Sequence, residues 1–179
     1  MNISKIFRKN RQKLIKSLEF SYFLYDINIS LGSKYRETNN ISIKFFFQVV
    51  SWLYDWEFAK VRDYKQLLLD YPYWRSRKYY YQRIQKFVSN ELSIADFISE
   101  ILYPSLSNKK EAFDLIEDFR RQASIELDPK SFGFSKIISD LIPVLEGFDN
   151  DPKESFFTEN EFREIIENTA IKLEKYSIE

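Results

Sequence analysis

The chain has 179 residues, of which 44% are hydrophobic and 18% aromatic, so it is long and apolar enough to bury a core. It contains no cysteine, no histidine and only three glycines, which excludes disulfides, thiol and imidazole catalysis, the usual zinc, copper and haem sites, and glycine-rich phosphate loops. The net charge is zero, yet residues 1–88 carry 17 Lys and Arg against 7 Asp and Glu, whereas residues 89–179 carry 10 against 20. The two halves either neutralise each other or bind separate partners: phosphates or acidic lipids for the basic half, a basic protein for the acidic half.

The first predicted helix covers residues 3–25 and is cationic and amphipathic. Its apolar residues keep the helical period: Leu14, Ile15, Leu18, Tyr22 and Tyr25. Such a helix lies on an anionic membrane or on RNA, or it packs its apolar stripe against the fold and leaves a solvated basic face. Residues 27–40 lose the helical period and contain Gly32-Ser33 and Asn39-Asn40, so we expect a loop there.

Residues 45–56 form the most hydrophobic window of the chain. A helical period continues through it toward Pro72, where the missing backbone N–H predicts a stop. The positions that keep the period are Phe46, Val49, Val50, Leu53 and Trp56. We interpret the window as a central buried helix, because large apolar residues are usually buried; if the fold leaves it uncovered, it is a partner-binding surface.

Aromatic and cationic residues alternate through residues 71–86. Aromatic rings stack on bases and cations neutralise phosphates, so this segment is a candidate nucleic-acid surface, although no RNA-binding fold motif surrounds it. An aromatic-rich helix start with solvated arginines accounts for the same residues. The candidates are Trp74, Arg75, Arg77, Lys78, Arg83 and Lys86.

A helical hairpin is predicted around residues 84–104, where the chain changes from basic to acidic. One apolar stripe closes near Phe87, and a second begins at Ile94. Ser93 and Asp96 have the spacing of a capping box, and Pro104 is expected to end the second helix.

Three further apolar stripes follow, at residues 112–123, 134–148 and 162–176. Pro143 is expected to kink the second of these helices, and Gly147 to cap it in the left-handed conformation. Thr158 and Glu161 have the spacing of a capping box at the start of the last helix.

Four carboxylates cluster after residue 145, with Lys153 as the only cation close to them in sequence. The residues are Glu146, Asp149, Asp151 and Glu154. Their mutual repulsion costs stability, as expected for a surface that receives a basic partner. A calcium loop is excluded, because its sixth and twelfth positions are Glu154 and Asn160 in place of Gly and Glu. Carboxylates elsewhere lie opposite apolar stripes, so no catalytic residue, cofactor or metal site is predicted.

Three segments of the C-terminal half share a family pattern. They are Phe87-Val88-Ser89-Asn90-Glu91-Leu92-Ser93-Ile94-Ala95-Asp96-Phe97, Phe148-Asp149-Asn150-Asp151-Pro152, and Thr158-Glu159-Asn160-Glu161-Phe162-Arg163 through Lys172-Leu173-Glu174-Lys175-Tyr176. With these segments, residues 83–176 resemble the all-helical family of bacterial self-protective, colicin-like immunity proteins of the colicin D type. The resemblance implies a helical bundle that blocks a basic nuclease by presenting carboxylates where RNA would bind. Residues 1–82 lie outside it, and no individual inhibitory residue carries over.

The predicted fold is an all-α helical bundle. A basic, aromatic N-terminal extension over residues 1–78 is expected to pack on an acidic, immunity-like module of four helices over residues 79–179. We expect a non-enzymatic protein-protein interaction module that needs no cofactor and binds a basic partner, either a nuclease toxin or a subunit of a larger complex. The alternative is an organellar or bacterial assembly factor that binds RNA, a ribosome or a membrane complex through its N-terminal half. No segment reaches the ~20 apolar residues of a membrane span, and the composition is typical of an AT-rich genome, which indicates the cytoplasm or a plastid stroma.

Overall fold

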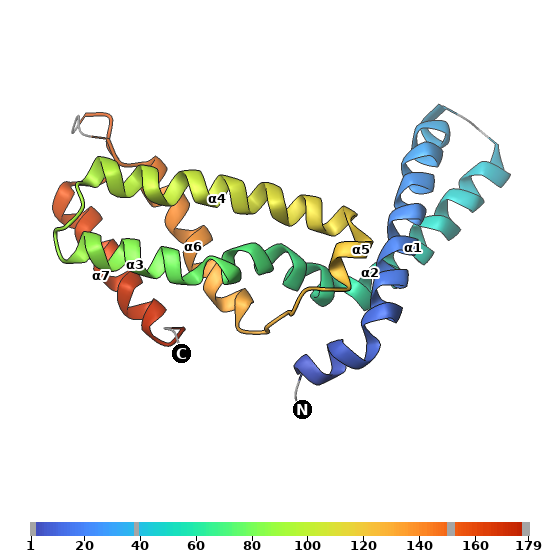
Figure 1. Ribbon diagram of the computed structural model, residues 1–179. Helices are drawn as coiled ribbons and strands as arrows, with labels where there is room; N and C mark the ends of the chain where they lie inside the picture. The colour runs from blue at the N-terminus through green and yellow to red at the C-terminus, as the bar shows by residue number, and fades with distance from the viewer. Residues whose placement is uncertain (1–2, 38–39, 150–152, 177–179) are drawn as a thin grey trace. The chain divides into compact units, whose positions relative to one another are not determined.

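The computed structural model describes residues 3–37, 40–149 and 153–176, with side chains from residue 10 onward. Helices and short connections make up all of these residues, with no strand among them, which confirms the predicted all-α class (Figure 1). The helices are α1 (Ile3–Glu37), α2 (Ile41–Arg75), α3 (Arg77–Val88), α4 (Ile94–Glu117), α5 (Phe119–Gln122), α6 (Ser131–Glu146) and α7 (Glu159–Glu174). In the described part of the chain, none of them is both long enough and apolar enough to cross a membrane.

The chain folds as two compact units. Unit 1 comprises Met1–Leu68 and Leu115–Glu126, and unit 2 comprises Leu69–Asp114 and Leu127–Glu179. Helices α2 and α4 each begin in one unit and end in the other. Unit 1 carries 14 Lys and Arg against 9 Asp and Glu, whereas unit 2 carries 13 against 18, so the charge asymmetry of the sequence follows the two units.

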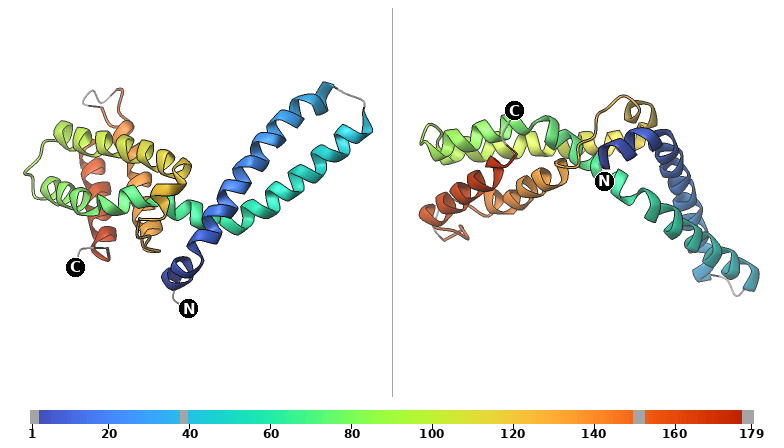
Figure 2. Two further views of the ribbon diagram at one scale, coloured as in Figure 1. Left: turned by 45° about the vertical axis from the view of Figure 1, so that its right-hand side comes forward. Right: turned by 90° about the horizontal axis from the view of Figure 1, so that it is seen from below.

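In unit 1, α1 and the first part of α2 run antiparallel as a long hairpin (Figure 2). The rings of Tyr35 and Phe47 meet across it, with centroids 4.8 Å apart. Helix α5 packs against α1, where Arg11 Nη1 donates a hydrogen bond to the Ala123 carbonyl at 3.0 Å. The buried apolar residues of the unit are Leu18, Leu24, Val50, Val61, Tyr64, Leu67, Leu68, Leu115, Ile116 and Ile125.

The loop predicted at residues 27–40 is wrong, because α1 continues through most of it. Gly32 lies against Phe47: a Cβ added to this glycine would be 3.5 Å from Phe47 Cε2, so the two helices approach each other closely here. Packing between the helices outweighs the low helix propensity of glycine. Residues 38–39 of the predicted loop lie outside the described residues.

Pro72 and Pro104 do not end helices as predicted, because each lies inside one, in α2 and in α4. A proline removes one backbone hydrogen bond and costs about 3 kcal/mol in a helix interior. In α4 the buried face continues past Pro104, from Ile101 on one side to Asn108 and Ala112 on the other. Burial on both sides of the proline offsets the lost hydrogen bond.

Gly147 is the C-cap of α6, with Pro143 inside that helix. The predicted left-handed cap is wrong, because Gly147 has φ −87° and ψ −4°. The absence of a side chain serves close packing instead: a Cβ would lie 2.9 Å from Phe156 Cδ2 and 3.1 Å from the Pro143 carbonyl oxygen. A left-handed residue does occur at Asn90, with φ 60°, directly after the C-cap of α3.

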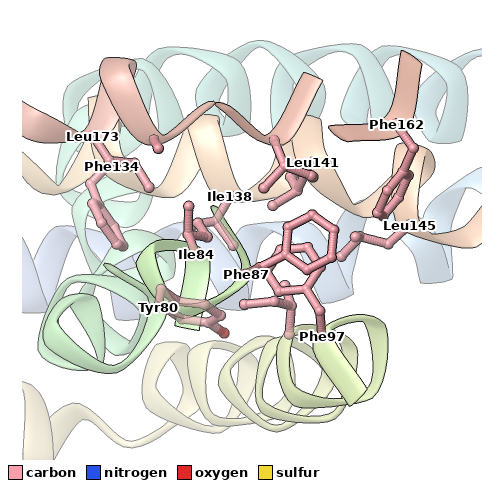
Figure 3. Close-up of a cluster of buried hydrophobic side chains, with 13 residues drawn as sticks. Tyr80, Ile84, Phe87, Phe97, Phe134, Ile138, Leu141, Leu145, Phe162 and Leu173 are labelled. Carbon is pink, nitrogen blue, oxygen red and sulfur yellow. The ribbon is translucent and has the colours of Figure 1, made fainter. Parts of the chain in front are cut away.

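The core of unit 2 is one cluster of side chains from α3, α4, α6 and α7 (Figure 3). Helix α7 packs against both α3 and α6. The rings of Phe87 and Phe97 stack with centroids 4.3 Å apart, and Phe162 meets both of them edge-on. The buried members are Tyr80, Ile84, Phe87, Phe97, Ile101, Phe134, Ile138, Leu141, Leu145, Phe162, Ile166, Ala170 and Leu173. The stripes predicted for these helices therefore meet in a single core.

The N-termini of α4 and α7 are capped by side-chain hydrogen bonds from the predicted residues. At α7 the capping box is complete: the Glu161 N–H donates to Thr158 Oγ1 at 3.3 Å, and the Thr158 N–H donates to Glu161 Oε2 at 2.8 Å. At α4 the Asp96 N–H donates to Ser93 Oγ at 3.1 Å, and the Ser93 hydroxyl in turn donates to the Asp96 carboxylate at 2.6 Å. Each cap satisfies a backbone N–H that has no partner within its helix.

Candidate functional site

The basic and aromatic residues predicted at 71–86 lie at the end of α2 and along α3, and most of them contribute to packing within unit 2. The Trp74 indole meets the rings of Phe134 and Tyr176 edge-on, with centroids 6.0 and 6.4 Å apart. The Arg77 guanidinium lies 4.5 Å from the Trp74 ring centroid and donates to the Trp74 carbonyl. Trp74 is therefore a half-buried packing residue rather than an open platform for a base.

Two arginines of the same segment form ion pairs. Arg75 donates from both Nη atoms to the Glu111 carboxylate, at 2.9 and 2.6 Å. Arg83 Nε lies 3.0 Å from Glu100 Oε2, an ion pair in which the N–H is not aligned for a hydrogen bond. The remaining cations of the candidate set, Lys78 and Lys86, are exposed. Few cations of this segment are therefore available to bind the phosphate backbone of a nucleic acid.

Arg163 on α7 is engaged in the same way. Its Nε pairs with Glu159 at 3.0 Å, its Nη1 donates to Asn90 Oδ1 at 3.0 Å, and its guanidinium lies 5.0 Å from the Phe87 ring centroid. With Arg75, Arg77 and Arg83, this accounts for every arginine that unit 2 has in the sequence. The arginines of unit 2 thus stabilise its own packing, while the unit retains an excess of carboxylates.

Of the four predicted acidic residues, Glu146 is the last residue of α6, and Asp149 and Glu154 lie in the connection to α7. Glu146, Asp149 and Glu154 are exposed, and Asp151 lies outside the described residues. The Phe156 N–H donates to the Gly147 carbonyl at 2.9 Å and closes the connection on itself. This hydrogen bond places Gly147, the residue after Glu146, next to Phe156, two residues beyond Glu154, and the C-terminus of α6 adds its partial negative charge. We call Glu146, Asp149 and Glu154 the acidic loop.

Two polar side chains buried in unit 2 have hydrogen-bond partners within the unit. Asp70 accepts a hydrogen bond from the Ser135 hydroxyl, and Tyr80 Oη accepts one from Asn108 Nδ2 at 2.9 Å. Burial raises the pKa of Tyr80, so its phenol stays protonated at neutral pH. Among the residues that the structure describes, no three Asp or Glu side chains come together in a way that would hold a metal ion.

The prediction that residues 45–56 are buried is wrong for most of the window. Phe46 and Trp56 are exposed, Val49 and Leu53 are half-buried, and Val50 alone of the predicted stripe is buried. The reason is that a helix in a hairpin buries the side that meets its neighbour, so a helix that is apolar on nearly every side keeps much of this surface exposed. In the sequence, the sign of this exposed surface was that apolar residues occur on nearly every side of the helix.

Six aromatic side chains of the hairpin are between 47% and 66% exposed. They are Phe20, Phe23, Phe45, Phe46, Trp52 and Trp56, which we call the aromatic face. The indoles of Trp52 and Trp56 stack at 5.9 Å with 9° between their planes, and Phe20 stacks on Phe23 at 6.3 Å. Exposed apolar surface of this kind marks binding sites for proteins, ligands or membranes. The aromatic face is therefore a second candidate surface, on unit 1.

Comparisons with protein-family models, with curated proteins and with solved structures give no match for this chain.

Proposed function

We propose that the chain is a non-enzymatic interaction protein that binds a basic protein partner through the acidic loop of unit 2. One observation carries this proposal: Glu146, Asp149 and Glu154 are all exposed within nine residues of the chain, in a unit whose carboxylates outnumber its Lys and Arg by 18 to 13. An acidic surface attracts a basic protein over long range and orients it during encounter.

Electrostatic complementarity of this kind supports fast and selective binding. Close charge pairs across an interface couple by about 1.5 to 7 kcal/mol, and the largest values require that both charges lose water. A partner that presents Arg or Lys to the acidic loop would form such pairs. A nuclease with a basic RNA-binding surface has this chemistry, in keeping with the resemblance to immunity proteins. We propose the cytoplasm or a plastid stroma as the compartment in which the two proteins meet.

The proposal is tested by affinity capture from cells that express the chain. The binding variant is Glu146→Gln, Asp149→Asn and Glu154→Gln. The matched control is Glu19→Gln, Asp26→Asn and Asp55→Asn, which removes the same number of exposed carboxylates from unit 1. We expect the binding variant to lose a basic partner that both the control and the unmodified chain retain.

Equal capture by the binding variant and the unmodified chain, with helical content unchanged by circular dichroism, would place the interaction elsewhere. The assembly-factor alternative would then be the better account, with contact through unit 1 and with RNA or a ribosomal complex as the partner. Recovery of RNA in place of a basic protein would point to the same alternative.

A further inference from the structure

The aromatic face of unit 1 continues into lysines that lie in line with it. Lys16 and Lys13 precede Phe20 by four and seven residues, so helical periodicity places them on the same side of α1. On α2, Lys60 follows Trp56 by four residues, and its Nζ lies 3.7 Å from the Trp56 ring centroid. Cations therefore border the aromatic side chains on both helices.

An open depression on this side of the hairpin is lined by residues of α1 and by one residue of α2. It has a volume of about 480 Å³ and is lined by Gln12, Lys13, Lys16, Ser17, Phe20 and Glu57. Glu57 also pairs with Lys60 at 2.6 Å, so the lysines of α1 and of α2 lie on one side of the hairpin. The hydrogen bond from Lys60 lowers the pKa of Glu57, which keeps this carboxylate ionised and neutralised by its partner.

Around Phe20, the charge that remains on this side is positive. Lys13 and Lys16 are exposed. The exposed carboxylates of α1, which are Glu19, Asp26 and Glu37, are rotated by about 100° or more around the helix from Phe20 and lie nearer to Phe23. Aromatic side chains bordered by lysines are typical of helices that lie in the interface of an anionic bilayer.

We infer that the aromatic face binds the interfacial layer of an anionic lipid bilayer, with the hairpin lying on the membrane surface. Indole and phenyl rings favour the region between headgroups and acyl chains. Lysine side chains can keep their aliphatic part in that region while the ammonium group reaches the lipid phosphates. This inference is independent of the acidic loop, which belongs to unit 2.

Two other occupants fit the residues less well. A second copy of the hairpin would bring the same positive charge against Lys13 and Lys16, whereas an anionic headgroup layer neutralises it. Single-stranded nucleic acid would use the stacked Trp52 and Trp56, but the half-buried aliphatic residues Val49 and Leu53 between the aromatic rings have no counterpart in a nucleic-acid strand.

Vesicle co-sedimentation of the full chain tests the inference. One set of vesicles contains phosphatidylcholine alone and the other contains phosphatidylcholine with phosphatidylserine. The aromatic variant is Trp52→Gln with Trp56→Gln, and its control is Tyr103→Gln with Leu106→Gln, two exposed apolar residues of unit 2. The charge variant is Lys13→Gln with Lys16→Gln, and its control is Lys109→Gln with Lys110→Gln, two exposed lysines of unit 2.

We expect the unmodified chain to bind the anionic vesicles at least tenfold more tightly than the neutral ones. The aromatic variant should lose binding to both. The charge variant should bind the anionic vesicles roughly thirtyfold more weakly, as expected for two lysines near an anionic surface, and both controls should behave as the unmodified chain. Tryptophan emission should shift to the blue on addition of anionic vesicles, and this shift should be absent in the aromatic variant, which retains Trp74 as a reporter of the fold.

Failure of the unmodified chain to bind either vesicle would overturn the inference. Equal binding by either test variant and its control would do the same. Analytical sedimentation of the chain alone tests whether a second copy binds the aromatic face, and a titration with single-stranded RNA tests whether nucleic acid does. A dimer that the aromatic variant abolishes would assign the aromatic face to a second copy, and RNA binding tighter than vesicle binding would assign it to nucleic acid.

Discussion

Two glycines within or at the end of helices have different surroundings and therefore predict opposite effects of an added methyl group. At Gly32 the nearest atom to a new Cβ is Phe47 Cε2 at 3.5 Å, an ordinary contact. At Gly147 the new Cβ would meet Phe156 Cδ2 at 2.9 Å and the backbone oxygen of Pro143 at 3.1 Å. We expect Gly32→Ala to stabilise unit 1 by about 0.5–1 kcal/mol, because the unfolded chain loses backbone freedom.

We expect Gly147→Ala to destabilise unit 2 by about 1–3 kcal/mol, because the backbone oxygen cannot move away at low cost. Urea unfolding followed by circular dichroism measures both changes. The same sign for the two variants would contradict this reading of the two packing environments.

Buried tyrosines predict how stability changes at alkaline pH. Burial raises the pKa of Tyr64 from 10.0 to about 12, although Arg11 nearby lowers it. The folded state therefore holds the phenol proton more tightly than the unfolded state, so the contribution to stability is complete below pH 10 and is lost as the pH rises to about 12.

Tyr64→Phe should unfold more readily at neutral pH, by about 0.5–1.5 kcal/mol, because the hydrogen bond from Tyr64 Oη to Gln122 Oε1 is lost. Above pH 10 its stability should fall less steeply than that of the unmodified chain. Tyr103→Phe, which removes a phenol hydroxyl at an exposed position, is the control. Identical alkaline profiles for Tyr64→Phe and the unmodified chain would show that Tyr64 does not titrate with folding.

At the scale of single helices, the N-terminal caps predict which helix ends depend on one side chain for their stability. Thr158→Ala removes the acceptor for the Glu161 N–H at the start of α7, and we expect a loss of about 0.5–2 kcal/mol in the free energy of unfolding. Ser139→Ala is the matched control, since Ser139 is exposed in the interior of α6, where alanine favours the helix. Thermal denaturation measures both variants, and a cost at Ser139 equal to that at Thr158 would show that capping is not the cause.

The ends of helices were predictable where the signal is local, and not where it depends on distant packing. Thr158, Glu161, Ser93 and Asp96 make their hydrogen bonds within one helical turn, so spacing alone identifies the caps. Pro104 lies within α4 because buried residues on both sides of it hold the helix, and no local pattern reports that burial. Asn90 could have been recognised as a left-handed cap from its residue type, because asparagine is enriched in that conformation.

The same distinction applies to the candidate surfaces. The acidic loop was predictable because its residues are close in sequence. The engagement of Arg75 with Glu111 was not, because the two residues are 36 positions apart. The part of the aromatic face that lies in residues 45–56 was assigned to the core, because periodicity shows that these residues are apolar but not how many neighbouring elements are present to cover them.

At the scale of the whole molecule, the packing of Trp74 predicts where unit 2 can be separated. Residues 69–179 include Asp70 and Trp74, which contact Ser135, Phe134 and Tyr176 in the unit. A fragment that begins at residue 79, the boundary expected from the sequence, lacks both. We expect the longer fragment to unfold cooperatively and the shorter one to be less stable by roughly 3–5 kcal/mol, the usual cost of removing a large aromatic side chain. Urea unfolding of the two fragments measures this, and equal stabilities would place the unit boundary near residue 79.

The proposed role of the acidic loop is tested most directly by the salt dependence of partner association. The experiment measures the rate at which the captured basic partner associates with three proteins: the unmodified chain, the Glu146→Gln, Asp149→Asn and Glu154→Gln variant, and the unit 1 control. The salt concentration is raised from about 0.01 M to about 0.15 M, over which the screening length falls from about 30 to about 8 Å. We predict that the rate falls steeply for the unmodified chain and for the control, and that the acidic-loop variant associates more slowly at low salt with a much flatter dependence. Superimposable curves for all three proteins would contradict the proposal that the acidic loop receives the partner.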